Sequence, residues 1–127
     1  MWYRPALLKL ALIAGLVSGC EGEAAMPVRL LCDDAALCPL FAEAVLEAHP
    51  EWQIATPKQA AEEALRLTVL KQDRHAITAR LEWSAGNNPP IVGPEFGLSV
   101  MDREISAGMA KGFLLRLLDY SKVSFGW

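Results

Sequence analysis

The sequence has little of what catalysis and nucleic-acid binding require. It holds two histidines and three cysteines among 127 residues, and its twelve Lys and Arg residues form no basic cluster. Such scattered cations argue against binding of nucleic acid and against electrostatic attachment to anionic lipid. The sequence has no Gly-x-Ser-x-Gly motif and no phosphate-binding loop. We therefore predict a protein that is not an enzyme, holds no cofactor or metal and binds no nucleic acid.

A permanent membrane span is not expected either, because a spanning helix needs roughly 20 consecutive apolar residues. Residues 10–17 form a short apolar run, which follows Arg4 and Lys9 and precedes Ser18 and Gly19. Positive charge, a short apolar run and small residues, in that order, are typical of a secretory signal. We predict that residues 1–19 are this signal.

The segment Val17-Ser18-Gly19-Cys20 resembles the lipobox of bacterial lipoprotein precursors. The resemblance covers the first twenty residues, with valine where the family more often has leucine. It implies cleavage before Cys20 and lipid on the Cys20 thiol and on the new amino group. One acyl chain binds a bilayer only marginally, whereas two or three anchor durably at about 0.8 kcal/mol per buried CH₂. We expect a periplasm-facing protein of the bacterial envelope, on the inner or the outer membrane. An ordinary cleaved signal, or a true start at Met26, is the alternative.

Composition bounds the rest of the chain. Removal of Arg4 and Lys9 with the signal leaves ten basic residues against 15 acidic ones. Residues 20–27 are predicted to form a lipidated tether. Residues 28–127 are long enough for one domain with a core of its own, and we predict a single small domain.

The pattern of apolar residues predicts an α+β fold with the order β-α-β-α-β-β-β-α. In residues 76–83, Ile77 and Leu81 belong to an apolar set that alternates with polar residues, which is typical of a half-buried strand. Thr56-Pro57-Lys58-Gln59 has the composition of a helix start with a capping box, so a short helix is expected over residues 57–64. We predict a two-layer structure in which helices cover one face of a mixed β-sheet.

Cys32 and Cys38 are the next candidate site. Outside the cytoplasm, two cysteines that remain after lipidation of a third are expected to form a disulfide. The alternative is a periplasmic thiol-redox pair, since a cysteine near a helix start is more easily ionised. The spacing is C-x₅-C and not C-x-x-C, and Asp33 and Asp34 would oppose a thiolate. A structural disulfide is therefore the favoured interpretation.

The segment 87–96 is predicted to be a loop, and it holds Ile91, Val92 and Phe96 among prolines. Prolines reduce the entropy lost when a loop is held ready for a partner. These three residues either contact an envelope protein of unknown identity or close the open end of the domain's own core. With no catalytic motif, the sequence predicts a small lipid-anchored envelope protein that acts as a binding or assembly accessory.

Overall fold

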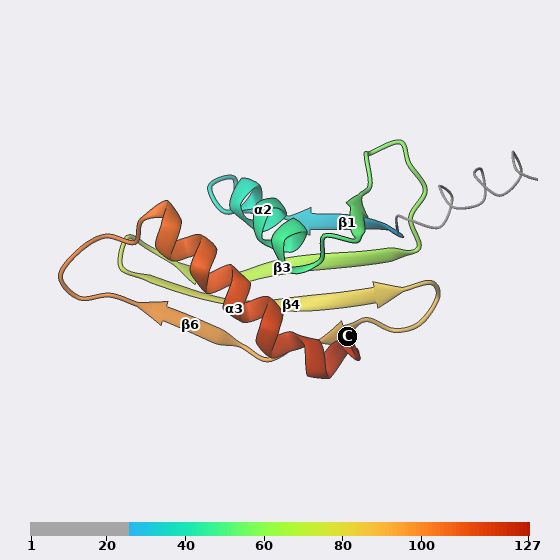
Figure 1. Ribbon diagram of the computed structural model, residues 1–127. Helices are drawn as coiled ribbons and strands as arrows, with labels where there is room; N and C mark the ends of the chain where they lie inside the picture. Colours follow the sequence, from blue (N-terminus) through green and yellow to red (C-terminus); the bar gives the residue numbers. More distant parts are fainter. Residues whose placement is uncertain (1–25) are drawn as a thin grey trace, which may run out of the picture.

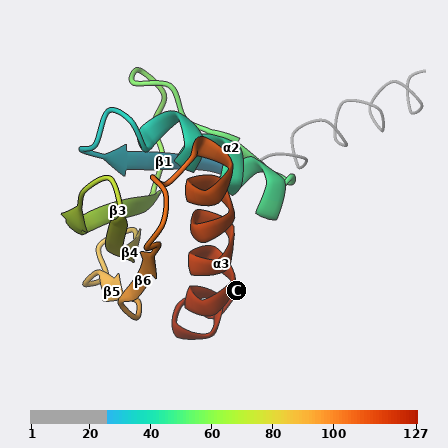
Figure 2. The same cartoon turned by 90° about the vertical axis from the view of Figure 1, so that its left-hand side faces the viewer.

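The computed structural model describes residues 26–127; the predicted signal and Cys20 lie outside the described residues. This part of the chain forms an α+β fold with two layers, a six-stranded mixed sheet and two helices on one of its faces (Figures 1 and 2). The predicted fold class is confirmed. The elements are β1 (Met26–Cys32), α2 (Cys38–Ala48), β2 (Trp52–Ile54), β3 (Glu63–Gln72), β4 (Ala76–Ala85), β5 (Ile91–Val92), β6 (Phe96–Ser99) and α3 (Ala107–Phe125).

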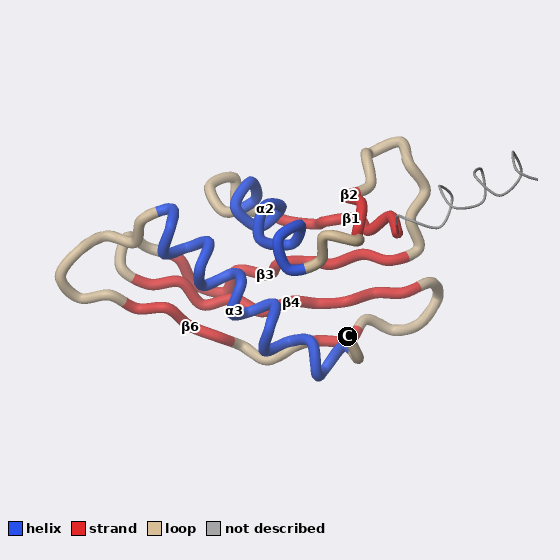
Figure 3. Tube along the Cα trace, in the orientation of Figure 1, coloured by secondary structure: helices blue, strands red, loops and turns tan. Residues whose placement is uncertain are grey.

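The sheet is parallel on one side and antiparallel on the other. Its strands are drawn red in Figure 3, and the two helices blue. β1 lies between β2 and β3 and is parallel to both. β3 and β4 form a long antiparallel hairpin, and β5 and β6 both pair with the far side of β4. The sheet order is therefore β2-β1-β3-β4, followed by the edge that β5 and β6 share.

The core lies between the sheet and the two helices. In β4 the alternation confirms the prediction, because Ile77, Ala79, Leu81 and Trp83 are buried and their neighbours are not. The facing side chains of α3 complete the core; they are Ala110, Phe113, Leu114, Leu117, Leu118 and Phe125. Burial of such side chains contributes about 1.5–3 kcal/mol each, which holds the two layers together.

Each helix begins and ends where its sequence indicates. α2 has Pro39 in its first turn, where a missing N–H costs nothing, and it ends before His49. α3 is capped by Ser106, whose Oγ accepts a hydrogen bond of 3.2 Å from the backbone N–H of Met109. It ends at Gly126, whose φ of 77° suits glycine.

The two helices pack side by side, and Lys111 of α3 connects them. Its Nζ lies 3.1 Å from Glu47 and 3.5 Å from Glu43, both on α2. The hydrogen bond and charge of Glu47 raise the pKa of Lys111 above its usual value, with Glu43 adding to the effect. Because both glutamates are more than half exposed, these ion pairs add little to stability.

Three sequence-based boundaries were wrong. No helix forms over residues 57–64. The N–H of Thr56 does donate to Gln59 Oε1 at 3.3 Å, but the capping pattern closes a turn and β3 begins at Glu63. β1 begins at Met26, so the last two residues of the predicted tether belong to the sheet. The predicted loop 87–96 contains β5, because two of its residues pair with β4.

Candidate functional site

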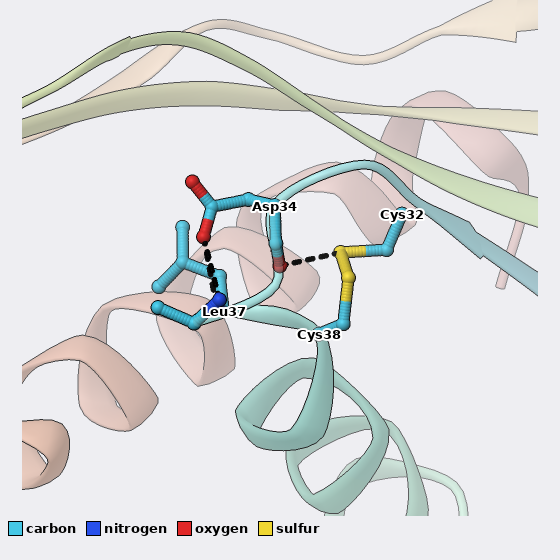
Figure 4. Close-up of a disulfide and its surroundings, with 5 residues drawn as sticks. Cys32, Asp34, Leu37 and Cys38 are labelled. Carbon is cyan, nitrogen blue, oxygen red and sulfur yellow. Dashed lines mark hydrogen bonds between the residues drawn. A yellow bond between two sulfur atoms is a disulfide. The ribbon is translucent and has the colours of Figure 1, made fainter.

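Cys32 and Cys38 form a disulfide, with Cα atoms 5.7 Å apart (Figure 4). Cys32 is the last residue of β1 and Cys38 the first of α2, so the bond ties a strand to the helix that follows it. The Cys32 sulfur lies 3.7 Å from the carbonyl oxygen of Asp34. This is a contact and not a hydrogen bond, because a disulfide sulfur carries no proton.

The turn between the two cysteines is held by Asp34. One carboxylate oxygen of Asp34 accepts hydrogen bonds of 3.0 Å from the backbone N–H groups of Ala36 and Leu37. Its carbonyl oxygen accepts another from Cys38 at 2.9 Å. Leu37 is buried in the core, so the turn is anchored from inside as well. Asp34 therefore has a structural role in this turn.

The segment 87–96 is not one surface. Ile91 and Val92 are 43% and 53% exposed, as expected of side chains available to a partner. Phe96 instead packs against the core, with its ring stacked on Phe113 and 4.5 Å, centroid to centroid, from Tyr120. Each of the two interpretations therefore fits part of this segment. Phe96 closes the core, whereas the side chains of Ile91 and Val92 stay accessible to solvent.

Each of the two histidines contacts other residues of the fold. His49 stacks on Trp52 with 3.9 Å between ring centroids, and its Nδ1 lies 3.3 Å from Glu51. His75 Nδ1 lies 2.8 Å from the carbonyl oxygen of Arg103. Within residues 26–127, no group of three or more His, Cys, Asp or Glu side chains could hold a metal ion.

An aromatic cluster closes the end of the core at which β1 begins. Trp52 also stacks on Trp83, with 5.6 Å between centroids. Trp127 stands nearly perpendicular to all three rings, at interplanar angles of 78° to 89°. A cavity of about 270 Å³ lies beside these rings, on the outside of the core.

A larger cavity of about 470 Å³ lies at the opposite end of the sheet. Its floor is apolar, from Leu37, Leu40, Ile77 and Ile105, and Arg74 and Glu104 form an ion pair of 3.4 Å at its rim. It lies between the start of α2, the β3–β4 turn and the start of α3. Asp73 is the third charged residue of its lining.

The face of the sheet that the helices leave open could not be recognised from the sequence. Residues paired across a sheet share a face, and the register places Arg29, Arg66, Lys71 and Arg80 on the face opposite the buried Leu65, Leu67 and Leu81. These four cations come from three strands and are far apart in sequence, so no cluster is visible there. The alternation within one strand shows which of its residues share a face. Only the pairing of the strands shows that these four cations share the same face of the sheet.

Comparisons with known proteins do not assign a function. No family model matches the chain, and no curated protein matches it. Among solved structures, the crystal structure of protein VC0702 from Vibrio cholerae is similar, with a TM-score of 0.47 and 8% sequence identity. The similarity covers 79% of this chain and 94% of that one. A likeness this weak carries no functional information.

Proposed function

We propose that this protein is a small lipoprotein of the bacterial envelope, held to a membrane by lipid on Cys20, and that it acts without catalysis as a binding or assembly accessory. The observation that carries the proposal is Val17-Ser18-Gly19-Cys20, placed after a positively charged and then apolar start. A lipid anchor of several acyl chains needs no transmembrane helix. None of the helices within residues 26–127 is both long and apolar enough to span a bilayer.

The arrangement of the domain supports this proposal. The sheet begins at Met26, six residues after Cys20, and six extended residues reach at most about 20–22 Å. A lipid on Cys20 would therefore hold the start of β1 close to the membrane surface. The exposed side chains Ile91 and Val92 suit contact with another protein.

Metabolic labelling tests the anchor. We expect radiolabelled palmitate to enter the wild-type protein and to be absent from Cys20→Ser, which removes the acylated sulfur. Fractionation of the same cells should recover the wild type with membranes and the variant without them. An unlabelled wild-type protein in the soluble fraction would contradict the proposal and favour an ordinary cleaved signal or a start at Met26.

The alternative function is thiol-redox exchange at Cys32 and Cys38. The observation in its favour is that Cys38 is the first residue of α2, where the helix dipole stabilises a thiolate. The hydrogen bonds of Asp34 across the intervening turn favour a structural bond instead. Thiol counting on protein taken from the envelope, before and after mild reduction, separates the two: a structural bond resists, whereas a redox pair is readily reduced.

A further inference from the structure

The open face of the sheet carries a segregated positive charge. Within residues 26–127 there are ten Lys and Arg and 13 Asp and Glu residues. The register places four of the cations, Arg29, Arg66, Lys71 and Arg80, on this face with one acid, Glu82. Asp33 and Asp34 line a cavity together with Thr68 and Lys71 of this face. The remaining six cations and ten acids lie elsewhere on the described surface. The protein as a whole is acidic, yet the face that no described helix covers is cationic.

The four cations follow one another along the sheet. Arg29 pairs with Ala64, Arg66 with Glu82, Arg80 with Thr68 and Lys71 with Thr78. These are four successive rows of side chains on the same face, which stand about 6.6 Å apart, twice the rise per strand residue. Each row holds one cation. The bulge between Val69 and Lys71 shifts the register so that Lys71 shares the face with Thr78.

These cations are only partly neutralised. Arg29 donates to the carbonyl oxygen of Gln59 at 2.7 Å, which orients its guanidinium without removing its charge. Arg80 lies 3.7 Å from Glu82 and is about one third exposed, and its Nε is buried without a hydrogen-bond partner in the described chain. Arg66 is exposed, and Glu82 also accepts from Thr68 at 3.4 Å. The face therefore keeps donors for incoming carboxylates.

Apolar side chains flank this row of charge. The row through Arg66 and Glu82 begins with Leu31 on β1 and ends with Val92 on β5. Val92, which the sequence placed in a partner-contacting segment, thus lies on the same face as the arginines. Arginine is one of the residues enriched in protein–protein interfaces, and the half-buried Leu31 and exposed Val92 add apolar surface beside it.

We propose that this open sheet face docks an acidic, extended segment of a protein partner, whose carboxylates on alternate residues meet the successive cations. Alternate residues of an extended chain are also about 6.6 Å apart, which matches the rows. Arginine binds a carboxylate through two parallel hydrogen bonds, and that geometry favours a polypeptide carboxylate here. The proposal rests on the accessory role proposed above, for which it supplies the chemistry of the partner.

The test uses the purified protein in detergent and a fluorescein-labelled peptide of four Glu-Thr repeats, followed by anisotropy at two salt concentrations. We expect saturable binding that weakens with salt. The double variant Arg66→Gln, Arg80→Gln should weaken binding at least about tenfold. Arg116→Gln, which removes an exposed charge from α3, is the matched control and should change it less than about twofold. Melting curves confirm that each variant is folded.

Several results would overturn the proposal. They are a wild type without saturable binding, equal losses in the double variant and in Arg116→Gln, and equal binding of a peptide with Gln in place of Glu. Reconstituted protein gives a further arm: loss of peptide binding in phosphatidylglycerol vesicles but not in phosphatidylcholine vesicles would assign the face to anionic lipid. Failure of Cys20 acylation leaves the measurements in detergent unaffected, so the two proposals fail separately.

Discussion

Gly93 lies against the side chain of Phe125. A Cβ atom at residue 93 would lie 3.1 Å from Phe125 Cζ and 3.1 Å from Ser121 Oγ, and the N–H of Gly93 donates to the Leu81 carbonyl oxygen at 2.8 Å. The segment between β5 and β6 is therefore fixed to β4 on one side and to the end of α3 on the other. Only glycine fits at this contact without a shift of its neighbours.

We expect Gly93→Ala to lower the free energy of unfolding by about 1–3 kcal/mol, because the added methyl overpacks the contact with Phe125. Differential scanning calorimetry should show a melting temperature several degrees lower. Gly112→Ala is the matched control, since nothing lies within 4 Å of a Cβ there and the residue is inside α3. That change should stabilise by up to about 1 kcal/mol. Two variants of equal stability would contradict the packing described for Gly93.

Replacing both Cys32 and Cys38 with alanine should lower stability by about 2 kcal/mol, since the disulfide closes a short loop in the unfolded chain. Urea denaturation of the oxidised wild type and of the double variant measures this difference. The Asp34 hydrogen bonds remain in the variant, so the native fold should persist. Free thiols at both positions in protein taken directly from the envelope would show that the bond is not structural.

Leu81→Ala should cost roughly 2–5 kcal/mol, because Leu81 is fully buried at the centre of β4. Arg80→Ala, on the opposite face of the same strand, should stay within about half a kcal/mol. Its ion pair with Glu82 is long, and truncation also removes an Nε that lacks a partner. Chemical denaturation measures the free energy of unfolding of both variants. Equal losses would contradict the assignment of Leu81 to the buried face of β4 and Arg80 to the open face.

Ile91→Ser combined with Val92→Ser should leave the melting temperature nearly unchanged, because both side chains are about half exposed. If they contact a partner, the same variant should lose its crosslinks in the native envelope. Phe96→Ser is the inward-facing control and should destabilise the domain, since its ring packs against Phe113. A destabilised double variant that keeps its crosslinks would remove Ile91 and Val92 from the binding surface.

Acid should weaken the β3–β4 turn through Asp73. The backbone N–H of His75 donates to Asp73 at 2.8 Å and holds the pKa of that carboxyl below its usual value. A carboxyl with a lowered pKa contributes stability at neutral pH and loses it as the pH falls through the folded-state pKa. Urea midpoints at pH 6 and pH 3 should therefore differ more in the wild type than in Asp73→Asn. An identical pH dependence would exclude this contribution.

Local patterns in the sequence determined much of this protein. Strict alternation identified β4 and its buried face, and the disulfide was predicted from the number of cysteines and their expected compartment. Each of these is an interaction between near neighbours in the chain or a consequence of one buried face. Cys20 also depends on a local motif, and its lipidation stays a prediction.

The tertiary structure decided what depends on pairing between distant segments. The Thr56–Gln59 pattern closes a turn because β3 is drawn into the sheet from Glu63, where its pairing with β1 and β4 outweighs a weak helix start. Ile91 and Val92 became a strand because β4 offered them a free edge. Arg29, Arg66 and Arg80 share one face only through the strand register. Register is set by long-range hydrogen bonds and core packing, which no local pattern encodes.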